Sequence, residues 1–239
     1  MYAVNHYEWV VANYAAVKAG LILVCINPAY QPRELNFALR HVGMRAIVSD
    51  TTYGRLPFSS VLSAAIQLGG VEQLEHVIFL DKTEFAINGI STHQIGSMIN
   101  DADSGDSAEM ERRIAKADFD SPCNIQFTSG TTGQPKAATL THHNLINHGN
   151  FMIGPSDAES GRCGFLAQVP FFHSGGCSST FSSMLNYGNE LIIPMPHFDA
   201  MAGLKALKAY DHIAYISGVP TMYNDMLQVT EMTGIITSS

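Results

Sequence analysis

The chain has 239 residues, of which 46% are hydrophobic, and its formal net charge is −8. This length is enough for one large or two modest domains with a substantial core. The acidic balance, with no basic cluster to offset it, argues against nucleic acid or an anionic membrane as a partner. The longest apolar run, residues 21–26, is far below the roughly 20 residues that a membrane span needs, so we expect no transmembrane segment.

The first half of the chain predicts helices that alternate with strands. Apolar residues recur with helical spacing from Val10 to Leu21, and Gly20 is expected to end that helix. A second helix is expected to begin at Pro32 and to end near Gly43. Strands are expected at residues 21–26, 46–48 and 76–80. Because apolar strands alternate with amphipathic helices, we predict an α/β fold with layered, parallel-rich sheets and flanking helices.

Residues 99–122 are rich in Asp, Ser and Ala and predict an acidic, solvated linker with one short helix. This linker is expected to separate a first α/β half, residues 1–98, from a second half, residues 123–239. Four cysteines are scattered without a C-x-x-C pair, so neither a zinc site nor a disulfide scaffold is indicated. A reducing, intracellular compartment fits best. Residues 1–4 lack a basic lead or a cleavage site, so we expect no transit peptide in this chain.

The run TSGTTGQPK, from Thr128 to Lys136, combines four hydroxyls, two glycines and one lysine in nine residues. Gly130 and Gly133 allow backbone N–H groups to turn inward and form a concavity that binds anions. Lys136 adds a compact positive charge, and Pro135 fixes the backbone before it. The run therefore predicts a loop that holds a polyphosphate.

The flanks of this loop predict a hairpin. Asn124–Phe127 leads in with apolar residues at alternate positions, and Ala137–Thr141 leads out as a second strand. The P-loop pattern G-x-x-x-x-G-K-[ST], which lies between a strand and a helix, is not present. The alternative is a polar turn in an ordinary hairpin, which would not require nine residues or a Pro-Lys exit.

Helices and strands alternate again after the loop. Thr141 can cap a helix over residues 142–152. Further strands are expected at residues 163–169, 190–193 and 213–216. Further helices are expected at residues 178–187, at residues 200–210 and from Val219-Pro220-Thr221 onward.

The loop resembles the AMP-binding signature of the adenylate-forming superfamily, [ST]-[SG]-G-[ST]-T-G-x-P-K-G, and departs from it only at Ala137. A methyl group there can crowd the loop exit. Three other segments, in family order, are similar to the fatty acyl-CoA synthetase branch, most of all to the medium-chain type. They are Ile26–Tyr30, Pro170–Gly176 and Val219–Tyr223.

The resemblance implies ATP-dependent activation of a fatty acid through an acyl-adenylate, which coenzyme A captures as acyl-CoA. The carboxylate and the triphosphate are both anions, so Mg²⁺, amide donors and lysine must neutralise the phosphates. Lys136 and His173 are the implied catalytic residues, and Thr131 is the hydroxyl expected near Mg²⁺. The implied ATP-binding residues are Thr128, Ser129, Gly130, Thr131, Thr132, Gly133, Gln134, Pro135 and Lys136. The implied acyl pocket comprises Val219, Pro220, Thr221 and Met222.

The histidines have structural alternatives. His173 ends a predicted strand, where side chains of open α/β sheets face the ligand crevice, but a lone histidine can also be only a hydrogen-bonded structural residue. The spacings within His142, His143 and His148 do not place two metal ligands on one helical face. We therefore expect surface or capping roles for these three.

The family's Y-G-x-T-E segment, ribose-binding aspartate, hinge and C-terminal lysine have no counterpart in this sequence. Residues 1–239 are therefore expected to be a partial large N-terminal domain without the small C-terminal domain, and to be inactive alone. Two functions stay open: the N-terminal portion of a fatty acid–CoA ligase, or a non-catalytic truncated nucleotide-binding or regulatory module. Luciferase-like oxidation and amino-acid adenylation are lesser alternatives. The resemblance is compatible with a mitochondrial matrix location, and the oligomeric state stays open.

Overall fold

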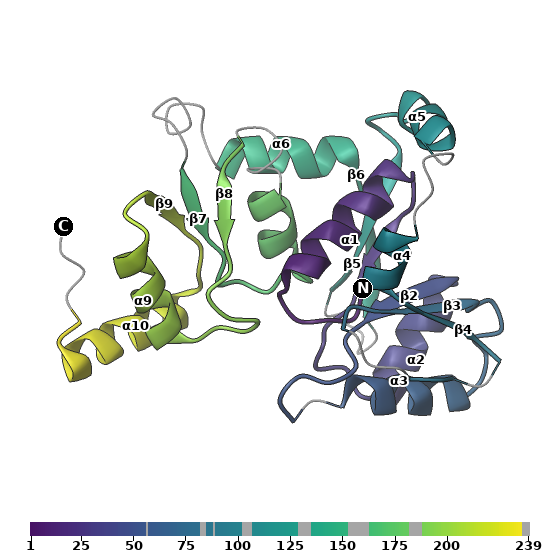
Figure 1. Ribbon diagram of the computed structural model, residues 1–239, viewed down its shortest axis with the longest axis horizontal. Helices are drawn as coiled ribbons and strands as arrows, with labels where there is room; N and C mark the ends of the chain where they lie inside the picture. Colours follow the sequence, from purple (N-terminus) through teal and green to yellow (C-terminus); the bar gives the residue numbers. More distant parts are fainter. Residues whose placement is uncertain are drawn as a thin grey trace. The chain divides into compact units, whose positions relative to one another are not determined.

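The computed structural model describes residues 1–55, 57–81, 85–87, 89–101, 107–128, 135–152, 163–181 and 188–235 (Figure 1). The chain divides into two compact units. Unit 1 comprises residues 1–4 and 8–142, and unit 2 comprises residues 5–7 and 143–239.

One sheet of unit 1 is entirely parallel, in the order β2-β3-β4. Its strands are β2 (Ala46–Ser49), β3 (His76–Phe79) and β4 (Ser91–Gln94). Helices α2 (Pro32–His41) and α3 (Phe58–Gln67) lie side by side against it (Figure 1). The core between these elements contains Leu35, Leu39, Ile47, Phe58, Leu62, Val77 and Phe79, all buried. The helix from Pro32 and the strands at 46–48 and 76–80 are thereby confirmed.

The other sheet of unit 1 has the order β1-β5-β6. Strand β1 (Leu23–Cys25) pairs parallel with β5 (Pro122–Thr128), which pairs antiparallel with β6 (Lys136–Thr141). The remaining helices of this part are α1 (Tyr7–Lys18), α4 (Ile95–Asn100) and α5 (Ser107–Ala115). Helix α5 is the short helix expected in the acidic segment.

The strand expected at residues 21–26 was predicted too long at both ends, because β1 is confined to Leu23–Cys25. Leu21 follows helix α1 and closes its last turn: its N–H donates to the Ala16 carbonyl, and the Gly20 N–H donates to the Val17 carbonyl. Gly20 has φ +70°, as such a left-handed helix stop requires. The N–H group of Leu21 is therefore bonded in the turn that ends the helix and does not pair in the sheet.

Unit 2 contains a parallel sheet of order β8-β7-β9, built from β7 (Gly164–Leu166), β8 (Glu190–Ile192) and β9 (Ile213–Ile216). Its core joins Leu166 and Ile192 to Ala206 of α9 (Ala200–Ala209). Helix α9 begins where the Asp199 carboxylate accepts the Ala202 N–H at 2.8 Å. The other helices of this unit are α6 (His142–Met152) and α10 (Pro220–Thr233).

Two predictions for unit 2 need correction. The strand expected over residues 163–169 pairs only at Gly164–Leu166, because the chain turns at Pro170. The helix expected at 178–187 begins earlier, as a π-helix over Gly175–Thr180, and residues 182–187 lie outside the described residues. The described strands form three sheets, as the predicted layers of sheets require, with parallel pairing everywhere except in the β5–β6 hairpin.

Candidate functional site

The predicted phosphate loop joins the two strands of the β5–β6 hairpin. Thr128 is the last residue of β5 and Lys136 the first of β6, and these two residues are cross-strand partners. Partners in an antiparallel pair project to the same face of the sheet. The side chains of Thr128 and Lys136 therefore lie on the same face of the hairpin. Both residues are exposed and Pro135 is half-buried. The hairpin is confirmed, and it presents one donor and one cation at the end where the predicted loop joins its two strands.

The rest of the loop, residues 129–134, lies outside the described residues. Phosphate contacts of Ser129, Gly130, Thr131, Thr132, Gly133 and Gln134 therefore stay predictions. Buried polar side chains support β5 beneath the loop: Gln126 Nε2 donates to Asn124 Oδ1 at 2.8 Å, and Asn124 Nδ2 contacts Cys25 Sγ at 3.5 Å. These side chains fix the strand from which the loop departs.

His173 lies in a tight turn between β7 and the π-helix. Its N–H donates to the Pro170 carbonyl at 3.2 Å, and its own carbonyl accepts the Cys177 N–H at 2.8 Å. The Gly175 N–H donates to His173 Nδ1 at 3.2 Å. Because Nδ1 accepts this bond, the proton of the neutral ring is on Nε2. The exposed imidazole therefore presents an N–H donor, and Nε2 has no partner in the described part of the chain.

Asn5 holds this turn from a distant point in the sequence. Its Nδ2 donates to the Val169 carbonyl at 2.9 Å, and its Oδ1 accepts the Phe171 N–H at 2.8 Å, so one side chain brackets Pro170 on both sides. Asn5 is buried, as is Phe171. The sequence analysis missed Asn5, since no local pattern links it to a turn more than 160 residues away.

The predicted acyl-pocket residues begin helix α10. Val219 is the N-cap and Pro220 occupies the first helical turn, which suits a residue without an N–H. Val219, Pro220 and Thr221 are exposed, and Met222 is half-buried. The helix start is confirmed, whereas the role of these residues as a pocket wall stays a prediction.

Comparison with known proteins decides the family. The model of the AMP-binding enzyme family matches residues 1–236 of this chain. The chain belongs to the AMP-binding enzyme family. The medium-chain acyl-CoA ligase ACSF2, mitochondrial, of Danio rerio is 34% identical over 241 residues, which cover 95% of this chain and 38% of that protein. The chain thus spans about 38% of the length of this curated relative.

Solved structures of AMP-binding enzymes share the fold. A putative long-chain-fatty-acid CoA ligase from Rhodopseudomonas palustris matches with TM-score 0.68 at 16% identity, over 94% of this chain and 51% of that one. The o-succinylbenzoate coenzyme A synthetase of Bacillus subtilis, in complex with ATP and magnesium ion, matches with TM-score 0.67 at 20% identity, over 94% of this chain and 40% of that one. The resemblance and the α/β fold class are confirmed.

The described part of the chain contains no cluster of side chains that would form a metal-binding site. Among the described residues, no group of three or more His, Cys, Asp or Glu side chains is placed to hold a metal ion. Thr131, the expected magnesium ligand, lies outside those residues, so its role stays a prediction.

All four cysteines are buried, and burial raises the pKa of the Cys123 thiol to about 11. In the described ranges we also find no helix with the length and apolar character to cross a membrane.

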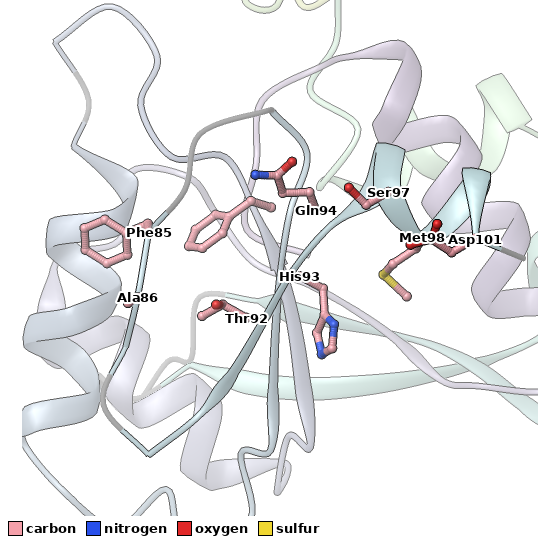
Figure 2. A pocket seen from close by; sticks show the side chains of 9 residues that line it. Phe85, Ala86, Thr92, His93, Gln94, Ser97, Met98 and Asp101 are labelled. Atoms are coloured by element: carbon pink, nitrogen blue, oxygen red, sulfur yellow. The ribbon is translucent and has the colours of Figure 1, made fainter.

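Unit 1 carries a separate open cavity of about 750 Å³ (Figure 2). Its lining includes Phe79 and Gln94, the last residues of β3 and β4, and Met98 of α4. None of the predicted site residues lines it. We therefore do not assign this cavity to the adenylate site.

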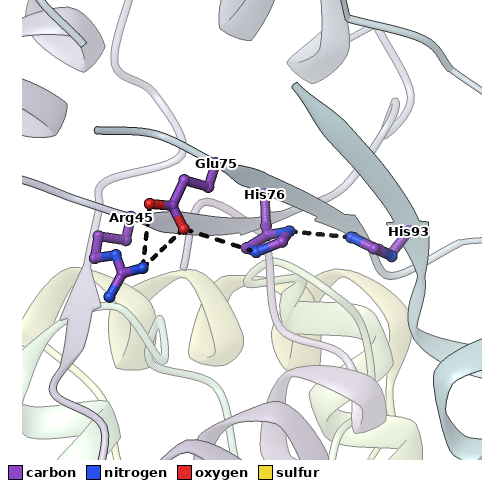
Figure 3. A network of polar contacts seen from close by, with 4 residues as sticks. All are labelled: Arg45, Glu75, His76 and His93. Atoms are coloured by element: carbon purple, nitrogen blue, oxygen red, sulfur yellow. Dashed lines mark hydrogen bonds and ion pairs between the residues drawn. The ribbon is translucent and has the colours of Figure 1, made fainter. Parts of the chain in front are cut away.

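A polar network lies at the start of β3 (Figure 3). Arg45 donates to both carboxylate oxygens of Glu75, at 3.1 and 2.8 Å, and this contact lowers the pKa of Glu75. His76 Nδ1 lies 3.2 Å from His93 Nε2. All four side chains are at the surface of unit 1, so the network is a solvated contact across strands rather than a buried centre.

Proposed function

We propose that this chain supplies the ATP-binding and acid-binding part of an AMP-forming fatty acid–CoA ligase. Family membership supports adenylate-forming chemistry, and the relatives in Danio rerio and Homo sapiens are named as medium-chain acyl-CoA ligases. The observation that carries the proposal is the pairing of Thr128 with Lys136 at the mouth of the predicted phosphate loop.

In the proposed reaction, a carboxylate oxygen attacks the α-phosphorus of ATP and pyrophosphate leaves. Lys136 places its charge beside the phosphates, and the Thr128 hydroxyl donates a hydrogen bond to them. Magnesium, held with the help of Thr131, would neutralise the remaining phosphate charge when bound. Coenzyme A thiolate then displaces AMP from the acyl-adenylate and forms the thioester.

His173 is proposed to bind the carboxylate of the acid. Its Nε2–H is an exposed donor; two backbone hydrogen bonds fix the turn that carries it, and the Gly175 N–H holds the ring through Nδ1. A positioned donor lowers the cost of holding the carboxylate in line with the phosphorus. Met222 and the start of α10 are proposed to contact the hydrocarbon tail, because Val219, Pro220 and Met222 have no ionisable side chain to pair with an amino acid.

The test is pyrophosphate exchange into ATP by a full-length enzyme that contains this chain. We expect exchange with octanoate and not with alanine, and a gain of about fourfold per methylene, or about 0.8 kcal/mol, until the pocket is full. Residues 1–239 alone are expected to make no acyl-CoA. Exchange that is equal with alanine and octanoate would contradict the substrate class. ATP binding with no exchange for any acid would favour the non-catalytic module instead.

The location of the protein is a further part of the proposal. The relatives in Danio rerio and Homo sapiens carry the word mitochondrial in their names. This similarity supports our proposal that the protein lies inside the cell, in mitochondria. Immunofluorescence of the tagged full-length protein with a mitochondrial marker tests the placement, and exclusion from the marker would contradict it.

A further inference from the structure

The hydroxyl of Ser178 is held on two sides. Its Oγ lies 2.7 Å from the Ser174 carbonyl oxygen and 2.7 Å from His148 Nδ1. A hydroxyl has one proton, and a carbonyl oxygen can only accept, so the hydroxyl donates to Ser174. The contact to His148 must then be donated by Nδ1–H. His148, in its neutral form, therefore has its proton on Nδ1 and a lone pair on Nε2.

His173 has the opposite arrangement. Its Nδ1 accepts the Gly175 N–H, so its proton is on Nε2. Both rings contact the same short π-helix: His173 meets its first amide, and His148 meets the buried Ser178 within it. Two histidines around one π-helix are thus fixed in opposite tautomers. Single-turn π-helices recur at functional sites.

We propose that His148 is a positioning residue for His173, acting through Ser178 and the first turn of the π-helix. Ser174 connects Ser178 to His173, because its carbonyl accepts the Ser178 hydroxyl and its chain neighbours are His173 and Gly175. With His148 present, Ser178 Oγ makes two bonds and keeps one rotamer. Without His148, the hydroxyl is free to turn away from Ser174, and the turn that orients the His173 ring loosens.

The consequence for carboxylate binding rests on the proposed function, whereas the two tautomers do not depend on it. A His173 ring that is fixed before the acid arrives pays less ordering entropy on binding. His148 lies on α6 and is exposed, and among the described residues its contact with the π-helix is the hydrogen bond to Ser178. It is therefore a positioning residue and not a catalytic one.

The test is nitrogen-15 NMR of the histidine rings in the 239-residue chain, recorded near pH 8.5, well above the usual histidine pKa of about 6.5. Two-bond proton–nitrogen spectra show which ring nitrogen carries the proton. We expect protonated Nε2 in His173 and protonated Nδ1 in His148. Protonated Nε2 in His148 would overturn the assignment.

Variants then test the link between the two rings. In His148→Ala, and equally in Ser178→Ala, the two His173 nitrogen resonances are expected to move toward each other as both tautomers become populated. His148→Asn, whose amide nitrogen can replace Nδ1–H, is expected to restore the wild-type positions, and Asn147→Ala on the same helix is the matched control. Unchanged His173 resonances in both His148→Ala and Ser178→Ala would overturn the proposal. Should no acid be activated by the full-length enzyme, the proposed function fails while these spectra still decide the positioning role.

Discussion

Gly176 packs directly against the carbonyl group of Pro170. A Cβ added at Gly176 would overlap the Pro170 carbonyl oxygen and would lie 2.8 Å from its carbon. The same carbonyl accepts the His173 N–H. The absence of a side chain at Gly176 therefore lets the π-helix pack against the Pro170 carbonyl, which also accepts the His173 N–H.

Gly176→Ala should destabilise the chain by about 1–3 kcal/mol, because backbone rather than a flexible side chain must move to admit the methyl group. Chemical denaturation measures this change. The matched control is Gly96→Ala in α4, where an added Cβ has open space; it should be neutral or stabilising by up to about 1 kcal/mol. Equal stability of the two variants would show that the close approach is not required.

Asn5→Ala should lower the free energy of unfolding by about 1–3 kcal/mol, because it leaves the Phe171 N–H and the Val169 carbonyl without their bonds. Asn147→Ala removes one exposed side-chain bond, to the His143 carbonyl, and should change stability by less than about 0.5 kcal/mol. Denaturant midpoints compare the two. A loss in Asn5→Ala no larger than that in Asn147→Ala would remove Asn5 from the account of the His173 turn.

Tyr2 gives the fold of unit 1 a pH dependence. Burial, with a smaller contribution from Glu34, raises the pKa of Tyr2 from 10.0 to about 12, and its hydroxyl donates to the Tyr30 carbonyl at 2.9 Å. The folded chain thus binds the phenol proton more tightly than the unfolded chain does. This stabilisation is complete below pH 10 and is lost as the pH rises toward 12.

Tyr2→Phe should therefore be less stable than the wild type by roughly 1 kcal/mol at pH 7. Because the wild type alone loses stability as the phenol ionises, this difference should narrow above pH 10 and change sign as the pH approaches 12. Urea unfolding at a series of pH values measures it. Tyr7→Phe, at a side chain that is 71% exposed, is the control and should track the wild type throughout. A difference between wild type and Tyr2→Phe that stays constant to pH 12 would contradict the argument.

Local patterns in the sequence were sufficient for most elements. The alternation in Asn124–Phe127 predicted β5, and Gly20 predicted the end of α1. Strand β4 was missed because Ser91–Gln94 is wholly polar, so no apolar signal marks it. Helix α3 was also missed, although Phe58, Leu62 and Ala65 recur at helical spacing and are buried.

The site was predictable only where chemistry lies in a contiguous motif. Thr128, Lys136 and His173 were found that way, and the structure places Thr128 opposite Lys136. The contacts around the His173 turn were not predictable, because Asn5 binds Val169 and Phe171, and His148 contacts Ser178, between segments far apart in the sequence. The π-helix contains Gly176, which packs closely against Pro170, and it has no periodic signal of its own.

The central claim is that the hairpin from Thr128 to Lys136 holds the phosphates of ATP during adenylation. The most direct measurement is octanoate-dependent exchange of pyrophosphate into ATP by the full-length enzyme, compared between Lys136→Ala and Lys116→Ala. Lys116 is an exposed lysine just after α5 and serves as the charge-matched control. We predict a fall of roughly 10- to 150-fold for Lys136→Ala, from the loss of one charge-assisted contact of about 1.5–3 kcal/mol, and no change for Lys116→Ala. Exchange by Lys136→Ala at the wild-type rate would contradict the account.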